Sequence, residues 1–401
     1  MLKGRKIVLG ITGGIAAYKA VELVRELVGA GAAVTVIMTR NAQQFVTPLT
    51  FQTLSGNPVT TELFNLIEES EIGHISLADR AELLVIAPAT ANIIGKIAGG
   101  IADDLLSTVV MATRAPVLLA PAMNVHMWQN PICQANVAKL RDLGYHFIEP
   151  ESGELACGYE GKGRLADLVT IMEEIHTLLS PKDFQGETIL VTAGPTEEAM
   201  DPVRFITNRS SGKMGYALAR AAQRRGAEVI LVSGASALPP PPKVRCLHVR
   251  SAAQMREAVL ESLEKASVLL MAAAVSDYRP KQMAREKMKK SAAETLLALE
   301  RTPDILAEAG KRKEGRLLIG FAAETERLLQ NARSKLEEKN LDLIVANDVT
   351  LPGAGFSVDT NIVKIIDRSG NVEELPLMSK EEVADRILDR VARLKNEAAK
   401  T

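Results

Sequence analysis

The chain has 401 residues, of which 47% are hydrophobic and 24% are charged, and its formal net charge is −1 at pH 7. This length fits two or three domains of ordinary globular composition, and the near-zero charge excludes a general electrostatic attraction to nucleic acid or to membrane surfaces. The three cysteines, Cys133, Cys157 and Cys246, form neither a disulfide framework nor a zinc pattern, which suits a reducing compartment.

The first half alternates apolar strands with helices. Its first ten residues enter a strand almost at once, which leaves no signal peptide, and no apolar run is long enough to span a bilayer, so we expect a cytoplasmic protein. Strands are expected at 6–11, 34–38, 82–87, 117–120 and 145–148, with helices such as 17–28 and 132–143 between them. This alternation predicts a parallel sheet with helices on both faces, which binds ligands at the carboxyl ends of its strands.

Glycines follow the first expected strand and open a helix. The backbone N–H groups of Gly13, Gly14 and the residues after them can hold an anion there, although the turn lacks the G-x-G-x-x-G spacing. After the second strand, Thr39 and Arg40 occupy the place where an NAD site carries Asp or Glu. They suit a phosphate, as in FMN or NADP, but either motif alone could equally be a plain turn.

The third and fourth strands each end in Ala-Pro-Ala followed by polar residues. Thr90, Asn92 and Asn124 offer hydrogen-bond donors and acceptors, and the small residues let a flat ring approach the backbone. His74 stands beside a glycine, although a lone histidine is more often structural than catalytic. Cys157 lies in a glycine-rich stretch with nearby cationic residues, which favours an exposed, acidified thiol on a mobile lid.

A second strand–loop–helix–strand unit begins at Thr188, after the breaker residues Ser180, Pro181 and Gly186. We therefore expect two domains, 1–180 and 188–401, joined by a linker at 181–187; the alternative is one long doubly wound sheet. Further strands are expected at 189–193, 229–232, 268–273, 317–322 and 343–346, followed by a hairpin of 362–367 and 372–375. A C-terminal helix is expected from Lys380, with Ser379 as its N-cap.

Polar groups again follow the strands of the second half. Asn208 and the Ser-Ser-Gly-Lys stretch after it suit a phosphate, and Asp277 follows a strand as a plausible polar or metal-linked carboxylate. Lys287 belongs to a dense positive run, which by itself is usually solvated surface. Thr302-Pro303-Asp304 predicts a helix with Pro in its first turn, and Lys335 and Lys339 share a helix face.

Segments 11–19, 121–128 and 156–164, together with His74, resemble the flavin-dependent cysteine decarboxylases over about residues 1–180. One small departure is Thr90, where that family often has Ser. The resemblance implies a Rossmann-like FMN protein with the flavin at a trimer interface, in which His74 is catalytic, Asn124 binds substrate and Cys157 is the proton donor. On the same resemblance we assign the FMN contacts to Gly13, Gly14, Ile15, Ala16, Thr39, Thr90, Asn92, Ser107 and Met123.

The family chemistry explains why a flavin is needed. Oxidation of the thiol carbon by FMN gives a thioaldehyde β to the carboxylate, which accepts the electrons when carbon dioxide leaves. In that family the reduced flavin then returns hydride, so that no external electron donor is needed, and the resemblance implies that Cys157 supplies the proton.

Segments 194–196, 201–204, 208–215, 277–279 and 320–325 resemble phosphopantothenate–cysteine ligase over about residues 186–401. Glu197 and Ser276 depart from the Arg and Ala that are usual there. The resemblance implies that 4′-phosphopantothenate attacks the α-phosphate of CTP and that cysteine then displaces CMP, with Mg²⁺ and lysines stabilising the phosphates. The same resemblance implies that Asn208 aids the acyl-cytidylate step and that Lys287 acts from a mobile loop.

We assign the nucleotide site on that resemblance, because composition and spacing select neither CTP over ATP nor any metal ligands. The assigned residues are Met271, Ala272, Ala273, Asp277, Lys287, Pro303, Asp304, Ile305, Leu306, Phe321, Lys335 and Lys339.

The two halves together resemble the fused bacterial enzymes of coenzyme A biosynthesis, in which the ligase product is the decarboxylase substrate. The resemblance implies small-molecule substrates and a homo-oligomer, for which a trimerising flavin half and a dimerising ligase half suggest a dodecamer. One alternative is an NADP-dependent oxidoreductase that uses Arg40, which leaves the second half unexplained. Another is a non-catalytic flavin-binding module, against which His74 and Cys157 argue.

Overall fold

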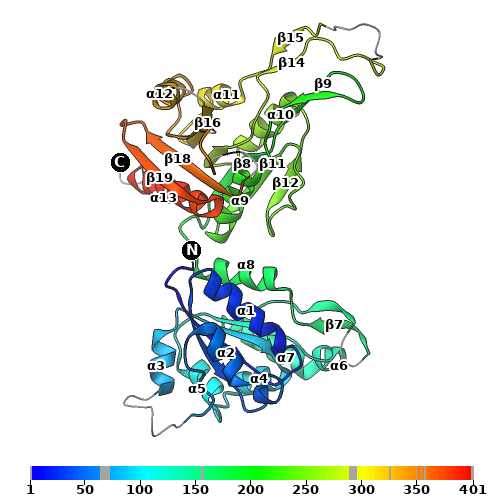
Figure 1. Ribbon diagram of the computed structural model, residues 1–401, viewed down its shortest axis with the longest axis vertical. Coiled ribbons are helices and arrows are strands. Elements are labelled where there is room, and N and C mark those ends of the chain that lie inside the picture. The colour runs from blue at the N-terminus through cyan, green and yellow to red at the C-terminus, as the bar shows by residue number, and fades with distance from the viewer. Residues whose placement is uncertain are drawn as a thin grey trace. The chain divides into compact units, whose positions relative to one another are not determined.

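The computed structural model describes residues 2–63, 73–154, 158–288, 296–324, 327–348, 350–353, 355 and 358–398. The chain divides into two compact units, Met1–Ser180 and Pro181–Thr401 (Figure 1). Each unit has its own sheet, its own hydrophobic cores and its own covering helices.

The first unit contains a five-stranded sheet in the order β2-β1-β3-β4-β5, in which all neighbouring strands are parallel. Its strands are β1 (Lys6–Ile11), β2 (Ala33–Met38), β3 (Leu83–Ala89), β4 (Val117–Pro121) and β5 (His146–Phe147). Every residue of β3 and β4 is buried, as expected where helices cover both faces of a parallel sheet.

Helices lie on both faces of this sheet. The helical elements are α1 (Ala17–Gly29), η1 (Ala42–Gln44), α2 (Pro48–Ser55), α3 (Gly73–Arg80), α4 (Ala91–Gly99), α5 (Leu105–Ala112), α6 (Val125–Gln129), α7 (Pro131–Asp142) and α8 (Leu168–Leu179). One core joins the strands to α1, α2 and α8, and the other joins them to α3, α4, α5 and α7. The amphipathic face of each helix therefore selects its side of the sheet.

The glycine-rich stretch of the first unit is more ordered in its described part than the sequence indicates. Strands β6 (Glu151–Glu154) and β7 (Glu160–Arg164) form a two-stranded antiparallel sheet, with Ser152 opposite Lys162 and Gly153 opposite Gly161. Glycines and charged residues alternate here without apolar positions, so the usual strand signal is missing. Cys157 lies outside the described residues.

The second unit contains an eight-stranded sheet in the order β12-β11-β8-β13-β16-β17-β18-β19. Its strands are β8 (Thr188–Ala193), β11 (Glu228–Ser233), β12 (Arg245–His248), β13 (Val268–Met271), β16 (Leu317–Glu324), β17 (Leu343–Asp348), β18 (Thr360–Asp367) and β19 (Val372–Ser379). The strands from β12 to β17 are parallel, whereas β18 and β19 form the expected antiparallel hairpin.

Helices and two small sheets complete the second unit. The helices are α9 (Lys213–Arg224), α10 (Ala252–Leu263), α11 (Ile305–Lys311), α12 (Leu328–Glu338) and α13 (Lys380–Ala398). The small sheets pair β9 (Glu197–Ala199) with β10 (Phe205–Thr207) and β14 (Tyr278–Pro280) with β15 (Leu299–Arg301). None of the helices in the described part of the chain combines the length and apolarity needed to cross a bilayer.

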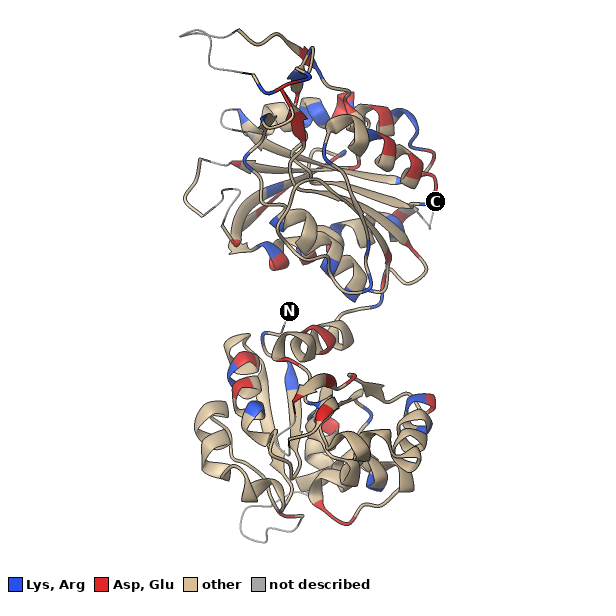
Figure 2. Ribbon diagram, turned by 90° about the vertical axis from the view of Figure 1, so that its right-hand side faces the viewer, with Lys and Arg blue, Asp and Glu red and all other residues tan. Residues whose placement is uncertain are grey.

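Two separate Rossmann-like sheets confirm the expected fold class, and the alternative of one long doubly wound sheet is wrong. Figure 2 shows charges of both signs on the helices and loops of each unit, while the strands of the sheets are mostly uncharged. Ser379 caps α13 as predicted, because its hydroxyl accepts the Glu382 N–H at 3.2 Å. Pro303, in contrast, precedes the N-cap Asp304 of α11 and so lies outside the first turn.

Segment 181–187 packs into the second unit. The Phe184 side chain is fully buried there, and its ring lies 5.1 Å from the guanidinium carbon of Arg225. Arg225 also forms an ion pair with Asp183, whose carboxylate accepts a hydrogen bond from Nε at 2.9 Å. These contacts tie the segment to α9, and Arg225 reaches α13 through a 2.8 Å ion pair with Asp389.

Candidate active site

A cavity of about 1250 Å³ opens at the carboxyl ends of β1, β2, β3 and β4. From β1 the chain reaches β2 on one side and β3 on the other, which makes this edge the switch point of the sheet. Open α/β sheets bind their ligands at such a point. The cavity is lined by Thr12, Gly13, Gly14, Ile15, Ala16, Tyr18, Lys19, Thr39, Arg40, Asn41, Thr90, Ala91, Asn92, Ile93, Lys96, Asp103, Asp104, Ala122, Met123, Asn124, Met127, Glu154, Gly158, Gly163, Arg164 and Leu165.

The glycine turn brings backbone to the cavity wall. A Cβ added at Gly13 would overlap the Asn41 Cβ, so only glycine fits between the two turns. Helix α1 begins directly after this turn, and its N-cap residue, Ala16, provides no side-chain cap. The first N–H groups of α1 bond within this turn, because the Ala17 N–H donates to the Gly14 carbonyl at 2.9 Å and the Lys19 N–H to the Ala16 carbonyl at 3.0 Å. An anion in the cavity would therefore be met by the N–H groups of the turn itself and by the positive end of the helix dipole.

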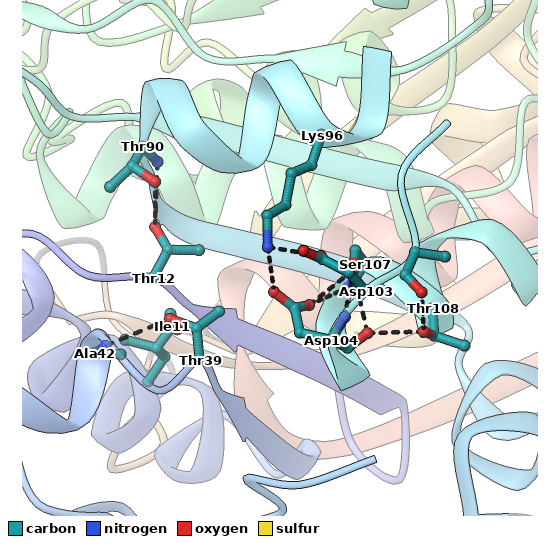
Figure 3. A network of polar contacts seen from close by, with 11 residues as sticks. Ile11, Thr12, Thr39, Ala42, Thr90, Lys96, Asp103, Asp104, Ser107 and Thr108 are labelled. Carbon is teal, nitrogen blue, oxygen red and sulfur yellow. Dashed lines mark hydrogen bonds and ion pairs between the residues drawn. The ribbon is translucent and has the colours of Figure 1, made fainter. Parts of the chain in front are cut away.

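Threonine hydroxyls hold the strand ends together at this wall (Figure 3). The Thr12 hydroxyl donates to the Pro88 carbonyl at 2.6 Å and lies 3.2 Å from the Thr90 hydroxyl. The Thr39 hydroxyl donates to the Ile11 carbonyl at 3.4 Å and accepts the Ala42 N–H at 3.3 Å. These bonds fix the turns that follow β1, β2 and β3 relative to one another.

A charged cluster forms another part of the wall. Lys96, on α4, points toward the segment before α5, where its Nζ lies 2.7 Å from Asp103 Oδ1 and 2.9 Å from Asp104 Oδ2 (Figure 3). Burial alone would raise the pKa of Asp104, but the Ser107 N–H and Lys96 outweigh it and hold that pKa below its usual range. Burial alone would lower the pKa of Lys96, but its hydrogen bonds to Asp103 and Asp104 outweigh burial and raise that pKa above its usual range. Lys96 and Asp104 therefore stay ionised at neutral pH.

Asn124 is oriented by the helix that follows it. Its side-chain oxygen accepts the His126 N–H at 2.8 Å and so caps α6. The neighbouring Met123 N–H donates to the Gly163 carbonyl of β7 at 3.0 Å. Asn124 therefore lies between α6 and the β6–β7 hairpin at the cavity wall.

The structure brings most of the predicted flavin-site residues to this one cavity. Those that line it are Gly13, Gly14, Ile15, Ala16, Thr39, Thr90, Asn92, Met123 and Asn124. Ser107 is fully buried and does not line the cavity, but its hydroxyl bonds Asp104, which does. His74, the second residue of α3, is half-buried and is not part of the cavity wall of this single chain.

Sequence reasoning missed the charged part of the wall. Asp104 and Ser107 have the spacing of an N-cap residue and its partner three residues later, and the structure confirms a capping box there. This signal predicts the start of α5, but it does not reveal that Lys96 on α4 pairs with Asp104 across the intervening loop.

In the second unit, several predicted nucleotide-site residues gather where α11 begins. The Thr302 N–H donates to the Asp277 carbonyl at 3.0 Å, and Lys339 Nζ lies 2.8 Å from Asp304 Oδ2. Burial would raise the pKa of Asp304, but Lys339 and the Ala307 N–H hold it below its usual range. Leu306 packs closely against Gly320 of β16, where an added Cβ would lie 3.0 Å from Leu306 Cδ2.

The remaining predicted residues lie on or near these elements. Met271 ends β13 and is buried with Ile305 and Leu306, whereas Ala272, Ala273 and Phe321 are half-buried. Lys335 lies in the last turn of α12, and Pro303 precedes α11. The Asn208 amide lies 3.2 Å from the carbonyl oxygens of Ala274 and Val275, just beyond β13. Lys287 is exposed next to Met288, whose N–H donates to Asp201 at 3.1 Å.

A smaller cavity of about 560 Å³ also lies in the second unit, and the predicted nucleotide residues do not line it. Its wall is formed by Glu197, Gly234, Ala235, Ser236, His248, Val249, Arg250 and Gln254. Within the ranges that the structure describes, His, Cys, Asp and Glu side chains form no group of three that could hold a metal ion.

The fold and the first cavity are those of a two-domain protein with an N-terminal flavoprotein unit. Residues 1–180 match the family model described as Flavoprotein, and residues 184–394 match the one described as DNA/pantothenate metabolism flavoprotein C-terminal domain. The chain is 51% identical to the coenzyme A biosynthesis bifunctional protein CoaBC of Bacillus subtilis (strain 168) over 398 residues, which cover 98% of both chains.

Two further relatives bear the same name. Identity is 46% over 390 residues with the protein of Vibrio cholerae (96% of this chain, 98% of the relative) and 45% over 395 residues with that of Escherichia coli (strain K12), covering 97% of each chain. The chain belongs to this family of bifunctional coenzyme A biosynthesis proteins. The family resemblance drawn from the sequence is therefore confirmed, and neither the oxidoreductase nor the non-catalytic module is favoured.

Proposed function

We propose that this chain performs two consecutive steps of coenzyme A biosynthesis. Its second unit joins 4′-phosphopantothenate to cysteine with CTP, through an acyl-cytidylate, and its first unit decarboxylates the product with FMN to 4′-phosphopantetheine. The proposal is carried by the cavity at the switch point of the first sheet, which gathers nearly all of the residues assigned to flavin and substrate. The nearly full-length match to bifunctional relatives extends it to both units.

We assign the decarboxylase to residues 1–180, the connecting segment to 181–187 and the ligase to 188–401. The division of the chain into two compact units, with the boundary between Ser180 and Pro181, supports this assignment. So do the two family matches, which end at residue 180 and begin at residue 184.

The residues of the first cavity fit FMN. The Gly13–Ala16 turn and the Thr39 hydroxyl suit its phosphate, with the cationic side chains of Lys19 and Arg40 in the same wall. Thr90, Asn92 and the backbone of Met123 suit the polar edge of its ring. FMN supplies the reversible two-electron oxidation of the substrate thiol carbon that makes decarboxylation possible.

The chain's own groups bind, orient and protonate the substrate. The amide of Asn124, the residue that caps α6, holds the substrate carboxylate beside the flavin ring. Cys157 delivers the final proton to carbon. His74 acts as the second catalytic group. Because His74 does not line the cavity of one chain, we propose that a neighbouring subunit of a homo-oligomer supplies it.

In the ligase unit, we place the nucleotide between the end of β13, the start of α11 and the Lys339–Asp304 pair. Asn208 assists formation of the acyl-cytidylate, and Lys287 neutralises charge on the phosphates. Mg²⁺ commonly binds nucleotide sites through substrate phosphates and water with few carboxylates, so the described residues need no dedicated metal cage. The proposed assembly is a dodecamer in the cytoplasm, with trimeric flavin units and dimeric ligase units.

Two single substitutions separate the activities. Cys157→Ser is expected to release carbon dioxide but to yield little 4′-phosphopantetheine, because the proton donor is lost, while CTP-dependent pyrophosphate release stays normal. Lys287→Gln is expected to slow pyrophosphate release about 10- to 100-fold and to leave decarboxylation of supplied 4′-phosphopantothenoylcysteine unchanged. Full 4′-phosphopantetheine yield from the first variant, or a normal pyrophosphate rate in the second, would contradict the corresponding assignment.

A further inference from the structure

The β6–β7 hairpin is seated directly on the segment that carries Asn124. A Cβ added at Gly163 would overlap the Met123 carbonyl oxygen, and one at Gly161 would lie 2.8 Å from Val125 Cγ2. The Met123 N–H donates to the Gly163 carbonyl at 3.0 Å. The two glycines therefore let the β7 backbone lie against the chain on either side of Asn124.

The far end of the same hairpin meets α6 through two aromatic rings. The rings of His126 and Tyr159 have centroids 5.2 Å apart and planes at 78°, which is the favourable edge-to-face arrangement. Tyr159 immediately precedes β7, and in the sequence only Gly158 separates it from Cys157. Gly158 has φ +79°, so this short connection depends on a backbone conformation natural to glycine.

His126 links the hairpin to the substrate-facing amide. Its backbone N–H holds the Asn124 side-chain oxygen at 2.8 Å, while its ring contacts Tyr159. One residue thus contacts both the side chain that lines the cavity and the residue that leads into the hairpin. Between the two glycines, Lys162 Nζ lies 2.5 Å from Glu149 Oε2, and Glu149 also pairs with Arg141. The hairpin is therefore held at Tyr159, before its first glycine, and at Lys162, between the two.

We infer that His126 and Tyr159 are positioning residues of the decarboxylase, whose ring contact holds the β6–β7 hairpin beside Asn124 and so sets the geometry of the cavity. The inference rests on the proposed function of the first unit. Neither ring performs chemistry: each acts through the residues that it places. Loss of the contact should therefore lower kcat more than it raises KM, because misplacement affects the reacting geometry more than the binding of the substrate.

The test uses the full chain loaded with FMN and compares substitutions that remove a ring with those that keep one. His126→Ala and Tyr159→Ala remove the contact, whereas His126→Phe and Tyr159→Phe retain an aromatic ring, and all four leave the backbone N–H to Asn124 in place. We expect each alanine variant to lose about 3- to 10-fold in kcat for carbon dioxide release, and each phenylalanine variant to stay within about twofold of the parent.

The double alanine variant tests whether the two residues act through one contact. If they do, the double substitution lowers kcat no further than either single one, because the interaction is already lost. Multiplied effects would overturn the inference, and so would phenylalanine variants as impaired as the alanine variants. Flavin content and CTP-dependent pyrophosphate release serve as controls for folding and should not change.

Hydrogen exchange separates failure of this inference from failure of the proposed function. The backbone amides of residues 159–164 should exchange about 2- to 10-fold faster in the alanine variants than in the parent, whether or not the protein decarboxylates anything. Unchanged exchange rates in the alanine variants would contradict the inference that the ring contact restrains the hairpin. A parent protein that binds flavin but releases no carbon dioxide would contradict the proposed function while leaving this exchange result in force.

Discussion

Gly13 leaves almost no room for a side chain in the wall of the first cavity, because a Cβ there would overlap the Asn41 Cβ. We predict that Gly13→Ala forces the turns after β1 and β2 apart and weakens FMN binding by about 5- to 100-fold, measured by fluorescence titration of the flavin-free protein. Gly29→Ala is the matched control, because a Cβ at Gly29 would meet nothing within 4 Å. Equal losses in the two variants would show that the Gly13 turn has no special role.

Asp385 carries a pH-dependent cost to stability. Burial raises its pKa to about 6, against the opposing effect of Arg225, and none of the described residues gives its buried Oδ2 a hydrogen bond. The folded chain therefore binds more protons than the unfolded chain between the ordinary aspartate pKa of 3.8 and about 6. This group's contribution is most favourable below that window and is lost as the pH rises through it.

Replacing Asp385 with Asn should remove this dependence. At pH 7 the free energy of unfolding should increase by about 1–3 kcal/mol, and the difference from the parent should shrink toward pH 4. Urea denaturation at several pH values measures both effects. The account is contradicted if the stability of the Asp385→Asn protein, measured as its difference from the parent, is lower at pH 7 than at pH 4. The charged carboxylate would then be stabilising.

Among the elements, the segment at 181–187 gives the sharpest prediction. Phe184 is fully buried against Arg225 in the second unit, so Phe184→Ala should cost about 3–5 kcal/mol. Phe184→Leu keeps most of the volume and should cost less than about 1.5 kcal/mol. In urea, loss of ligase activity should shift to lower concentration in the alanine variant, whereas flavin release from the first unit should keep its midpoint. A shift of flavin release instead would contradict the packing described here.

The long buried elements could be predicted from the sequence, because their apolar residues follow one period without interruption. Strands β1, β3 and β8 and helix α1 lie within a residue or two of their expected bounds. The short pairs β6–β7, β9–β10 and β14–β15 could not, because their strands are only three to five residues long and depend on pairing rather than on apolar periodicity. Helix α10 does carry a readable signal, the capping box formed by Ser251 and Gln254.

The candidate site was predictable to the extent that it lies at strand ends. Gly13, Thr39, Thr90 and Asn124 each follow a strand of the same parallel sheet, so their convergence follows from the topology. The pairing of Lys96 with Asp104 depends on how α4 and α5 pack, which no local pattern encodes. Whether His74 reaches a flavin remains a prediction about assembly, because it does not line the cavity of one chain.

At the scale of the whole molecule, each unit has a complete sheet and core of its own, and both family matches occur in one chain. This arrangement explains why the chain can carry two chemically unrelated reactions. The proposed product of the second unit, 4′-phosphopantothenoylcysteine, is the substrate of the first, so the order of the reactions is the reverse of the order of the units along the chain.

The most direct test is the product that one purified protein makes. The FMN-loaded chain is incubated with 4′-phosphopantothenate, cysteine, CTP and Mg²⁺, and the products are identified by mass spectrometry. We predict 4′-phosphopantetheine, with one CMP, one pyrophosphate and one carbon dioxide for each molecule formed. Accumulation of 4′-phosphopantothenoylcysteine by the flavin-loaded protein would contradict the decarboxylase, and absence of both products would contradict the ligase.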